Sequence, residues 1–288
     1  MADALHLPDD WRAAIERIEA EARERVIVVG PTDCGKSSFV RALLAADSSC
    51  EAIDADPGQK LVGPPGTVSL GRIAQEGGLE LGGFVFIGST SAANIFHITR
   101  ACEALARVSR RFVANTSGFV ARLGARLQAA TISALDADLI VAFGSDAEVG
   151  PILVKHPERA QARLQASPHA ARKTAAARAR LRQASFEAAL AGAVPLELSG
   201  IRFEPAPPIA FDLGGRHPVC SLADADGADM AVGVLEAASD GAVRVIARGP
   251  ALPVALVRLG SMWAERRDGG WGLLDTLHPS WIRDEPEG

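Results

Sequence analysis

Short apolar runs alternate with stretches of helical periodicity along the first two thirds of the chain. Val26–Val29, Phe112–Ala114 and Leu139–Phe143 are continuously apolar, as is typical of parallel strands buried on both faces. The segments "CEAIDAD", "GTVSLGRI" and "LELGGFVFIG" also read as strands. Between the strands, apolar residues at three- and four-residue intervals predict helices over residues 8–25, 36–47, 92–108 and 120–135. This alternation predicts an α/β fold with a mainly parallel sheet covered on both faces.

The pattern changes near residue 201. An arginine-rich stretch that predicts a helix comes before this point, followed by "VPLELS", a candidate last strand of the sheet. Beyond it, helical patterns end and two apolar runs flank Asp240-Gly241, a strong hairpin signal, while Asp268-Gly269-Gly270 offers a second turn. Residues 201–288 are therefore expected to form a small β-rich C-terminal domain. Its tryptophans are expected to pack in a core or an interface: Trp263, Trp271 and Trp281.

A phosphate-binding motif follows the first strand. Gly30, Gly35, Lys36 and Ser37 fit the spacing G-x-x-x-x-G-K-S between a strand and a helix. The glycines allow successive backbone N–H groups to surround a phosphate at the helix start, where the helix dipole favours an anion. Lys36 would reach the β- and γ-phosphates, and the Ser37 hydroxyl would bind Mg²⁺. The loop residues expected to hold the nucleotide are Gly30, Thr32, Asp33, Cys34, Gly35, Lys36, Ser37 and Ser38.

Two carboxylates end the second predicted strand, in "IDADPGQ". Asp54 and Asp56 are two residues apart, so an extended backbone places both side chains on one face. One carboxylate could hold Mg²⁺ directly or through water, and the other could accept a proton from an attacking hydroxyl. The alternative is a turn in which Asp56-Pro57-Gly58 only changes the chain direction. The nearby phosphate loop favours the catalytic interpretation.

Length and composition bound the domain organisation. At 288 residues with 48% hydrophobic residues, the chain suits one large domain with a small addition. We expect a helical lead-in over residues 1–25, a P-loop NTPase domain over residues 26–200 and the β-rich domain over residues 201–288. The four cysteines lack the spacing of a disulfide framework or a zinc site. An acidic N-terminus without a signal peptide and the polar residues within 81–99 predict a cytoplasmic protein without a membrane span.

The charge distribution is uneven. The formal net charge is −5, yet residues 155–192 contain eight basic residues against two acidic ones. A basic segment in an acidic protein is where a polyanion would be held, although a solvated arginine-rich helix is the simpler alternative.

The ordered set "GPTDCGKSS", "DADPGQ", "FVFIGSTSAAN", "NTSGF" and an arginine-rich helix resembles the polynucleotide 5′-hydroxyl kinases over about residues 26–198. The resemblance implies a phosphotransferase that moves the γ-phosphate of ATP, or of GTP, to the 5′-hydroxyl of RNA or DNA with Mg²⁺. It implies single-stranded or end-exposed nucleic acid as the partner, in RNA processing or the repair of 5′-hydroxyl ends. Because only about 25 residues precede the first strand, a stand-alone prokaryotic type is expected, with no obligatory protein partner and no membrane.

The family pattern assigns roles to particular residues. Its D-x-x-Q motif falls on Asp56, the implied general base and metal ligand, and on Gln59, which would position the substrate or a metal-bound water. Its "lid" motif R-x-x-x-R, within about residues 155–192, falls on Arg178 and Arg182. At i, i+4 these arginines share a helix face and could close over the transferred phosphate.

The family's "clasp", T-x-G followed by an aromatic residue, falls on Thr116, Gly118 and Phe119. Phe119 replaces the usual Trp, so it offers less stacking area and no N–H donor, and Ser117 stands where Pro is usual.

Two other functions stay open. An ATP-binding scaffold or regulatory protein without turnover is favoured by Phe119, but the four residues Lys36, Asp56, Arg178 and Arg182 argue against it. A kinase for a small hydroxyl metabolite would suit the same fold, whereas basic residues spread over a long segment favour a polymer.

Overall fold

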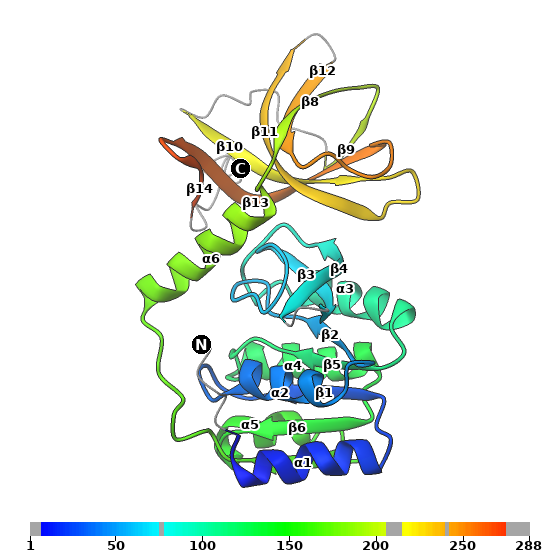
Figure 1. The fold of residues 1–288 in the computed structure, drawn as a ribbon, viewed down its shortest axis with the longest axis vertical. Coiled ribbons are helices and arrows are strands. Elements are labelled where there is room, and N and C mark those ends of the chain that lie inside the picture. The colour runs from blue at the N-terminus through cyan, green and yellow to red at the C-terminus, as the bar shows by residue number, and fades with distance from the viewer. Residues whose placement is uncertain (1–6, 75–77, 206–214, 240–241, 275–288) are drawn as a thin grey trace, which may run out of the picture.

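The computed structural model describes residues 7–74, 78–205, 215–239 and 242–274. Among these residues, two seven-stranded sheets are connected by one long helix, α6 (Ala175–Ala189), as Figure 1 shows. The first sheet contains β1 (Arg25–Val29), β2 (Glu51–Asp54), β3 (Thr67–Ile73), β4 (Leu79–Phe86), β5 (Phe112–Asn115), β6 (Leu139–Phe143) and β7 (Ala160–Leu164). The second contains β8 (Val194–Ser199), β9 (Arg202–Glu204), β10 (Arg216–Ala223), β11 (Asp229–Ser239), β12 (Ala242–Ala247), β13 (Leu256–Arg267) and β14 (Gly270–Leu274).

The first sheet is mainly parallel, as expected. Its strand order is β4-β3-β2-β5-β1-β6-β7, and the five strands from β2 to β7 in this order run parallel, while β3 and β4 form an antiparallel edge. Every residue of β5 and β6 is buried, which explains their continuous apolar sequences. In the register, Asn115 lies opposite Val28 on one side and Asp54 on the other. The ends of β1, β2 and β5 therefore meet at one edge of the sheet.

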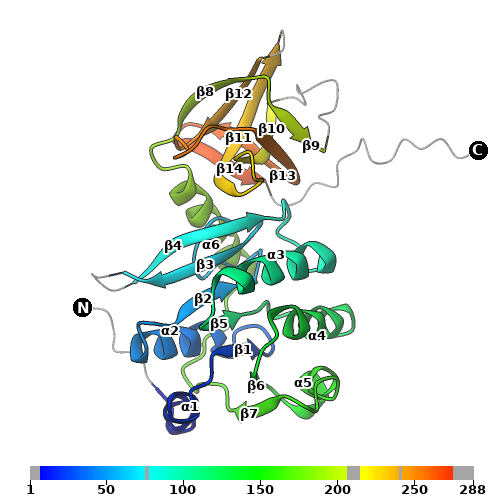
Figure 2. The same cartoon turned by 90° about the vertical axis from the view of Figure 1, so that its right-hand side faces the viewer.

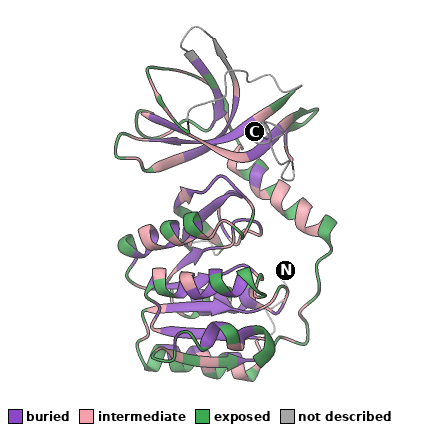
Figure 3. Ribbon diagram, turned by 180° about the vertical axis from the view of Figure 1, so that it is seen from behind, coloured by how far each residue is buried: buried purple, intermediate pink, exposed green. Residues whose placement is uncertain are grey.

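Helices cover both faces of this sheet. The helices are α1 (Asp9–Ala20), α2 (Lys36–Ala46), α3 (Ile95–Val108), α4 (Leu123–Leu135) and α5 (Asp146–Leu153). The apolar side chains of α1 and α2 form one core with one face of the sheet, and those of α3, α4 and α5 form a second core with the other face. Figure 3 shows the buried strands between these layers. No helix in the described ranges has the length and apolar character needed to cross a bilayer.

The N-terminal helix is part of the core. Trp11 of α1 is fully buried, and its ring packs edge-on against Phe39 and Phe143, with centroids 5.8 and 5.3 Å away. Its indole N–H donates to the Gln165 carbonyl oxygen at 2.9 Å. The sequence predicted the helix but not this central tryptophan.

The second sheet is β-rich as expected, with strand order β14-β13-β10-β11-β12-β8 and β9 beside β13. The hairpin predicted at Asp240-Gly241 is confirmed, because β11 pairs antiparallel with β12, and the second turn candidate joins β13 to its antiparallel partner β14. Residues 240–241 of the first turn lie outside the described residues, as does Trp281. Trp263 and Trp271 are buried, in line with their expected role in packing.

The helix α6 joins the two sheets. Phe186 on α6 is fully buried in a cluster with Phe84 and Phe86 of β4 and with Met262 and Trp271 of the second sheet. Figure 2 shows the β3–β4 hairpin lying between the second sheet and the rest of the first. The second sheet thus packs on the edge hairpin of the first.

Two expectations are wrong. Residues 160–164, expected within a helical stretch, form the edge strand β7, whose residues alternate between less and more exposed positions. The segment "VPLELS" is β8, but it pairs with β12 at the edge of the second sheet and not with the parallel sheet. Pro195 lacks an N–H to donate and is compatible with such an edge position.

Candidate active site

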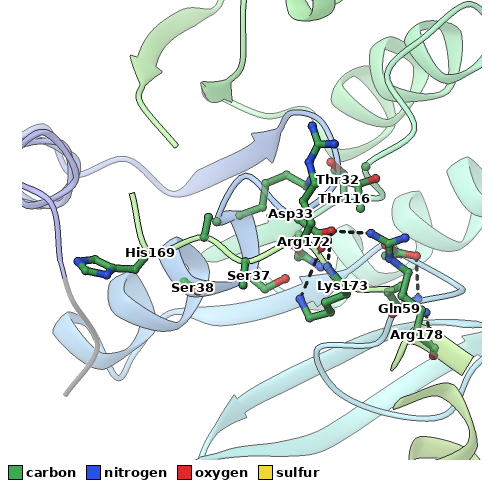
Figure 4. A pocket seen from close by; sticks show the side chains of 17 residues that line it. Thr32, Asp33, Ser37, Ser38, Gln59, Thr116, His169, Arg172, Lys173 and Arg178 are labelled. Atoms are coloured by element: carbon green, nitrogen blue, oxygen red, sulfur yellow. Dashed lines mark hydrogen bonds and ion pairs between the residues drawn. The ribbon is translucent and has the colours of Figure 1, made fainter. Parts of the chain in front are cut away.

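A cavity of about 490 Å³ lies at the carboxyl ends of β1, β2 and β5 (Figure 4). Four segments that are distant in the sequence surround it: the phosphate loop, the turn after β2, the turn after β5 and the approach to α6. The lining residues are Thr32, Asp33, Gly35, Lys36, Ser37, Ser38, Asp56, Gln59, Asn115, Thr116, Gly118, His169, Ala170, Ala171, Arg172, Lys173 and Arg178. The predicted motifs are therefore brought together around one space.

The phosphate loop has a backbone that suits anion binding. Gly35 ends the loop at φ 103°, and a Cβ atom there would lie 2.6 Å from the Trp11 ring, so α2 can begin here only with glycine. The Lys36 ammonium is buried and donates to the carbonyl oxygens of Gly30 at 2.8 Å and Pro31 at 2.7 Å. Burial lowers the pKa of Lys36. An anion in the cavity would restore the charge partner that this buried ammonium lacks.

Two loop residues expected to hold the nucleotide, Gly30 and Cys34, are not among the lining residues of the cavity. Cys34 is 6% exposed, and burial raises the pKa of its thiol, which keeps it neutral. The cysteine therefore packs in the core beneath the loop and does not face the cavity.

The turn after β2 orients Asp56 toward the cavity. Asp56 Oδ1 accepts hydrogen bonds from the backbone N–H groups of Gly58 at 2.9 Å and Gln59 at 3.0 Å. Burial and the nearby Asp54 carboxylate raise the pKa of Asp56. A carboxylate with a raised pKa is a better proton acceptor. Gln59, the other residue of the D-x-x-Q motif, lines the cavity, and its amide reaches the Arg178 carbonyl oxygen at 3.4 Å.

Asp54 does not line the cavity but holds the chain after this turn through hydrogen bonds. Its fully buried carboxylate lies 3.1 Å from the Lys60 ammonium and accepts from the Leu61 N–H at 2.6 Å. Lys60 also donates to the carbonyl oxygens of Asp54 and Thr67, both at 3.1 Å. Of the two carboxylates found in the sequence, only Asp56 faces the reaction space.

The clasp residues divide into two groups. Thr116 and Gly118 line the cavity, and the Thr116 hydroxyl donates to the Val28 carbonyl oxygen at 2.8 Å. Gly118 lies directly against the Thr32 backbone, where a Cβ atom would come within 2.5 Å of the Thr32 Cα. Phe119 is 39% exposed and does not line the cavity. The aromatic ring is thus available just outside it.

The predicted lid, about residues 155–192, contains the strand β7, the irregular segment 165–174, called the lid segment below, and α6. Arg178 and the lid-segment residue Lys173 both contact Asp33 of the phosphate loop. The Arg178 guanidinium lies 2.5 Å from Asp33 Oδ2, and the Lys173 backbone N–H donates to the same oxygen at 3.0 Å. Arg182, one turn further along α6, is not among the lining residues. Of the two lid arginines, the structure places Arg178 at the cavity.

The basic segment found in the sequence has two parts. Arg159 pairs with Asp136 at 2.8 Å and Arg163 pairs with Asp146 at 2.8 Å, both on the body of the first sheet. Arg172, Lys173 and Arg178 instead line the cavity. Only the second part could contact a bound polyanion there.

The proposed metal ligands Ser37 and Asp56 both line the cavity. Within the described residues, no group of three or more His, Cys, Asp or Glu side chains could hold a metal ion. Mg²⁺ usually takes one or two protein oxygens and completes its shell with phosphates and water. One hydroxyl and one carboxylate fit that mode of binding.

Several lining residues were not among the predicted site residues, namely Asn115, His169, Ala170, Ala171, Arg172 and Lys173, although Arg172 and Lys173 belong to the basic segment found in the sequence. Asn115 had a readable signal, because it is a polar residue directly after a buried parallel strand. The other five belong to the lid segment, whose path over the cavity depends on tertiary packing.

A family model described as mRNA cleavage and polyadenylation factor CLP1 P-loop matches residues 30–190, more than half of the chain. The chain is 34% identical over 161 residues to a CLP1 homolog of Dictyostelium discoideum, covering 48% of this chain and 35% of that protein. It is 27% identical over 161 residues to a protein named polyribonucleotide 5′-hydroxyl-kinase from Pyrococcus furiosus, covering 51% of this chain and 46% of that protein. The matches therefore span less than half the length of these relatives.

A solved structure of the interface between Pcf11p and Clp1p has a similar fold. It superposes with a TM-score of 0.66 at 13% sequence identity, covering 86% of this chain and 77% of that chain. The first sheet and the helices that cover it occupy only about half of the chain. The similarity therefore extends beyond them.

Proposed function

The chain belongs to the CLP1 P-loop family, and from this premise we propose that it is a polynucleotide 5′-hydroxyl kinase. It would transfer the γ-phosphate of ATP to the 5′-hydroxyl end of RNA or DNA. The observation that carries the proposal is a single cavity lined by Lys36 and Ser37 of the phosphate loop, by Asp56 and by Arg178. Phosphoryl transfer needs groups that hold phosphates, accept a proton and stabilise charge, and these residues supply all three.

The phosphate loop supports nucleotide binding. Thr32, Gly35, Lys36, Ser37 and Ser38 border the cavity at the start of α2, where backbone N–H groups and the helix dipole favour an anion. ATP bound there would supply the phosphoryl group, and Mg²⁺ would be held by Ser37 and Asp56. The proposal assigns residues only to the phosphates and the metal, and none to the nucleotide base. GTP is therefore a second phosphate donor to test.

Asp56 is the proposed general base. Its Oδ1 is held by two backbone N–H groups, and its raised pKa favours taking the proton of an incoming hydroxyl. Gln59 borders the same space and would orient the hydroxyl-bearing end. Arg178 would leave Asp33 for the transferred phosphate, where an arginine supplied to a P-loop site can contribute about 10³–10⁵ in rate.

The nucleic-acid substrate is proposed from charge and from the names of relatives. Arg172, Lys173 and Arg178 border one side of the cavity in a protein of net charge −5, so the positive charge is concentrated where a polyanion would enter. Phe119 lies just outside and offers a ring for stacking on a terminal base. The Pyrococcus furiosus relative is named as a polyribonucleotide 5′-hydroxyl-kinase.

The test is the transfer of labelled γ-phosphate from ATP, and in parallel from GTP, to RNA and DNA oligonucleotides of the same sequence with 5′-hydroxyl ends. The wild type is expected to label the 5′ end. Arg178→Ala is expected to lower the rate by about 10³ or more, and Lys36→Ala is expected to abolish transfer.

Arg180→Ala is the matched control, because Arg180 is an exposed arginine on the same helix and does not line the cavity. It should retain most of the transfer. An oligonucleotide that already carries a 5′-phosphate should accept no label. If the wild type binds nucleotide but labels neither polymer, the proposal is wrong, and a scaffold or a kinase of small hydroxyl compounds takes its place.

A further inference from the structure

Asn115 has an unusual position at the edge of the cavity. It is the last residue of β5, between β1 and β2, and it is 2% exposed while lining the cavity. Its amide nitrogen donates to Asp54 Oδ1 at 3.0 Å. Its amide oxygen has no hydrogen-bond partner among the described residues.

The orientation of this amide is determined by its neighbour. Asp54 is a carboxylate held by the Lys60 ammonium, so it can only accept hydrogen bonds. The NH₂ group of Asn115 must therefore point at Asp54, and Oδ1 must point away from it. The buried Asp54–Lys60 pair fixes this arrangement, because both side chains are almost completely excluded from solvent.

A buried carbonyl oxygen without a donor is unfavourable and rare in native proteins. Two strong donors that border the same cavity are engaged elsewhere. The Lys36 ammonium donates to two carbonyl oxygens of its own loop, and the Thr116 hydroxyl donates to Val28. Asp56 is a carboxylate acceptor. No donor of the described residues reaches Asn115 Oδ1, which leaves the missing donor to a molecule bound in the cavity.

We propose that Asn115 Oδ1 accepts a hydrogen bond from an O–H donor at the reaction centre, as a further ligand-positioning residue. The inference rests on the proposed function, in which two O–H donors approach this point. One is a water molecule of the Mg²⁺ hydration shell, and the other is the 5′-hydroxyl of the polynucleotide. The strand of Asn115 is adjacent to the strand that leads into the phosphate loop, and its side chain lines the same cavity as Ser37 and Asp56.

The first arm of the test uses titration calorimetry to ask whether a water molecule bound to Mg²⁺ is the donor to Asn115. The affinity for ADP is measured with Mg²⁺ and with EDTA, for the wild type and for Asn115→Leu, which keeps the volume but has no acceptor. If water on the metal is the donor, the gain in ADP affinity caused by Mg²⁺ falls about 10–100-fold in the variant.

The second arm uses fluorescence anisotropy to ask whether the 5′-hydroxyl of the oligonucleotide is the donor to Asn115. Oligonucleotides ending in a 5′-hydroxyl or in a 5′-deoxy carbon are compared in the presence of a non-hydrolysable ATP analogue. If the substrate hydroxyl is the donor, the wild type binds the hydroxyl form more tightly and Asn115→Leu loses this preference. Both arms measure binding, so they can be interpreted even if no phosphate is transferred.

Asn115→Asp separates this role from a purely structural one. An aspartate keeps an oxygen toward the cavity but loses the donor to Asp54 and adds a like charge. If Asn115 only supported Asp54, this variant would be at least as impaired as Asn115→Leu. The proposal instead expects Asn115→Asp to retain the discrimination that Asn115→Leu loses.

Asp138→Asn is the control, because it changes another buried side chain with one oxygen that lacks a hydrogen-bond partner, away from the cavity. Asp138 Oδ1 also has no partner among the described residues, but it lies at the opposite end of β1, where Oδ2 accepts from the N–H groups of Glu24 and Arg25. This variant should keep both discriminations. The inference is overturned if Asn115→Leu, folded as shown by its thermal unfolding, retains both the Mg²⁺ effect and the hydroxyl preference.

Discussion

At the scale of residues, Asp33 places a carboxylate inside a loop whose backbone suits anions. Its side chain is 7% exposed and contacts Arg178 and Lys173. Burial alone would raise the pKa of Asp33, but the Lys173 N–H and the two positive side chains outweigh it and hold the pKa below its ordinary value. The ionised carboxylate therefore stabilises the docked lid.

The Asp33 contact predicts a pH dependence of stability. Because the folded-state pKa is lowered, the stabilisation is complete above the unfolded pKa of about 3.9 and is lost as the pH falls through the lower folded value. We expect Asp33→Asn to reduce the free energy of unfolding by about 1–2 kcal/mol at pH 7 and by less at pH 3, where the unfolded state is already largely protonated. Urea unfolding of both proteins at the two pH values checks this, and a difference that grows toward pH 3 would contradict it.

The sequence predicted the site residues that belong to motifs and missed those that depend on register. Lys36, Ser37 and Asp56 follow from local spacing, and all three line the cavity. The position of Asn115 beside Asp54 depends on how β5 pairs with β2, and the two residues are 61 positions apart in the sequence. The Asp33–Arg178 contact spans 145 residues. No local pattern encodes such contacts.

At the scale of elements, α6 has two different halves. Its first half carries Arg178 to the cavity and begins at Thr174, whose hydroxyl accepts the Ala177 N–H at 3.1 Å. Its second half is held by Phe186 in the shared cluster and by Gln183, which bonds the backbone of Trp271 and Leu273 at 2.9 and 2.8 Å. The second sheet therefore helps to set the position of Arg178 at the cavity.

Phe186→Ala is expected to destabilise the protein by about 3–5 kcal/mol, because the ring is fully buried between the two sheets. Chemical denaturation at pH 7 measures this loss. Leu181→Ala is the matched control on the same helix, since Leu181 is 49% exposed and should change stability by less than about 0.5 kcal/mol. Equal losses in both variants would show that α6 is not anchored through Phe186.

The two misassigned strands show where reading an element from sequence fails. In β7, apolar residues at positions 160, 162 and 164 alternate with Gln161 and Arg163, a period-two signal masked by the surrounding arginines and alanines. For β8 the strand itself was found, but its partner β12 lies some 48 residues further along the chain. Strand propensity does not specify which sheet a strand joins.

At the scale of the whole molecule, the two sheets meet through close backbone contacts. The Ser261 N–H donates to the Gly88 carbonyl oxygen at 2.7 Å, and Asp229 of β11 accepts the Phe86 N–H at 2.8 Å. A Cβ atom on Gly260 would lie 2.5 Å from the Gly88 Cα. Glycine at this point permits the sheets to touch.

Gly260→Ala is expected to destabilise the protein by about 1–3 kcal/mol, because the added methyl group meets backbone that has little room to move. Gly249→Ala is the control, since no atom lies within 4 Å of a Cβ at that position. Urea unfolding compares the two variants. An unchanged urea midpoint for Gly260→Ala would show that the contact between the sheets accommodates the methyl group without a loss of stability.

If the proposed function holds, the path of the lid segment bears on which part of a polymer can reach the cavity. It is covalently continuous, running from β7 to α6, and its two ends are held by Gln165, whose N–H bonds Asp10 at 2.9 Å, and by the anchored α6. Both the lid segment and the phosphate loop border the cavity. Under the proposed function, this continuous segment is expected to hinder the middle of a long strand from entering sideways and to admit a free terminus. A preference for ends would then arise from enclosure, without any recognition of base sequence.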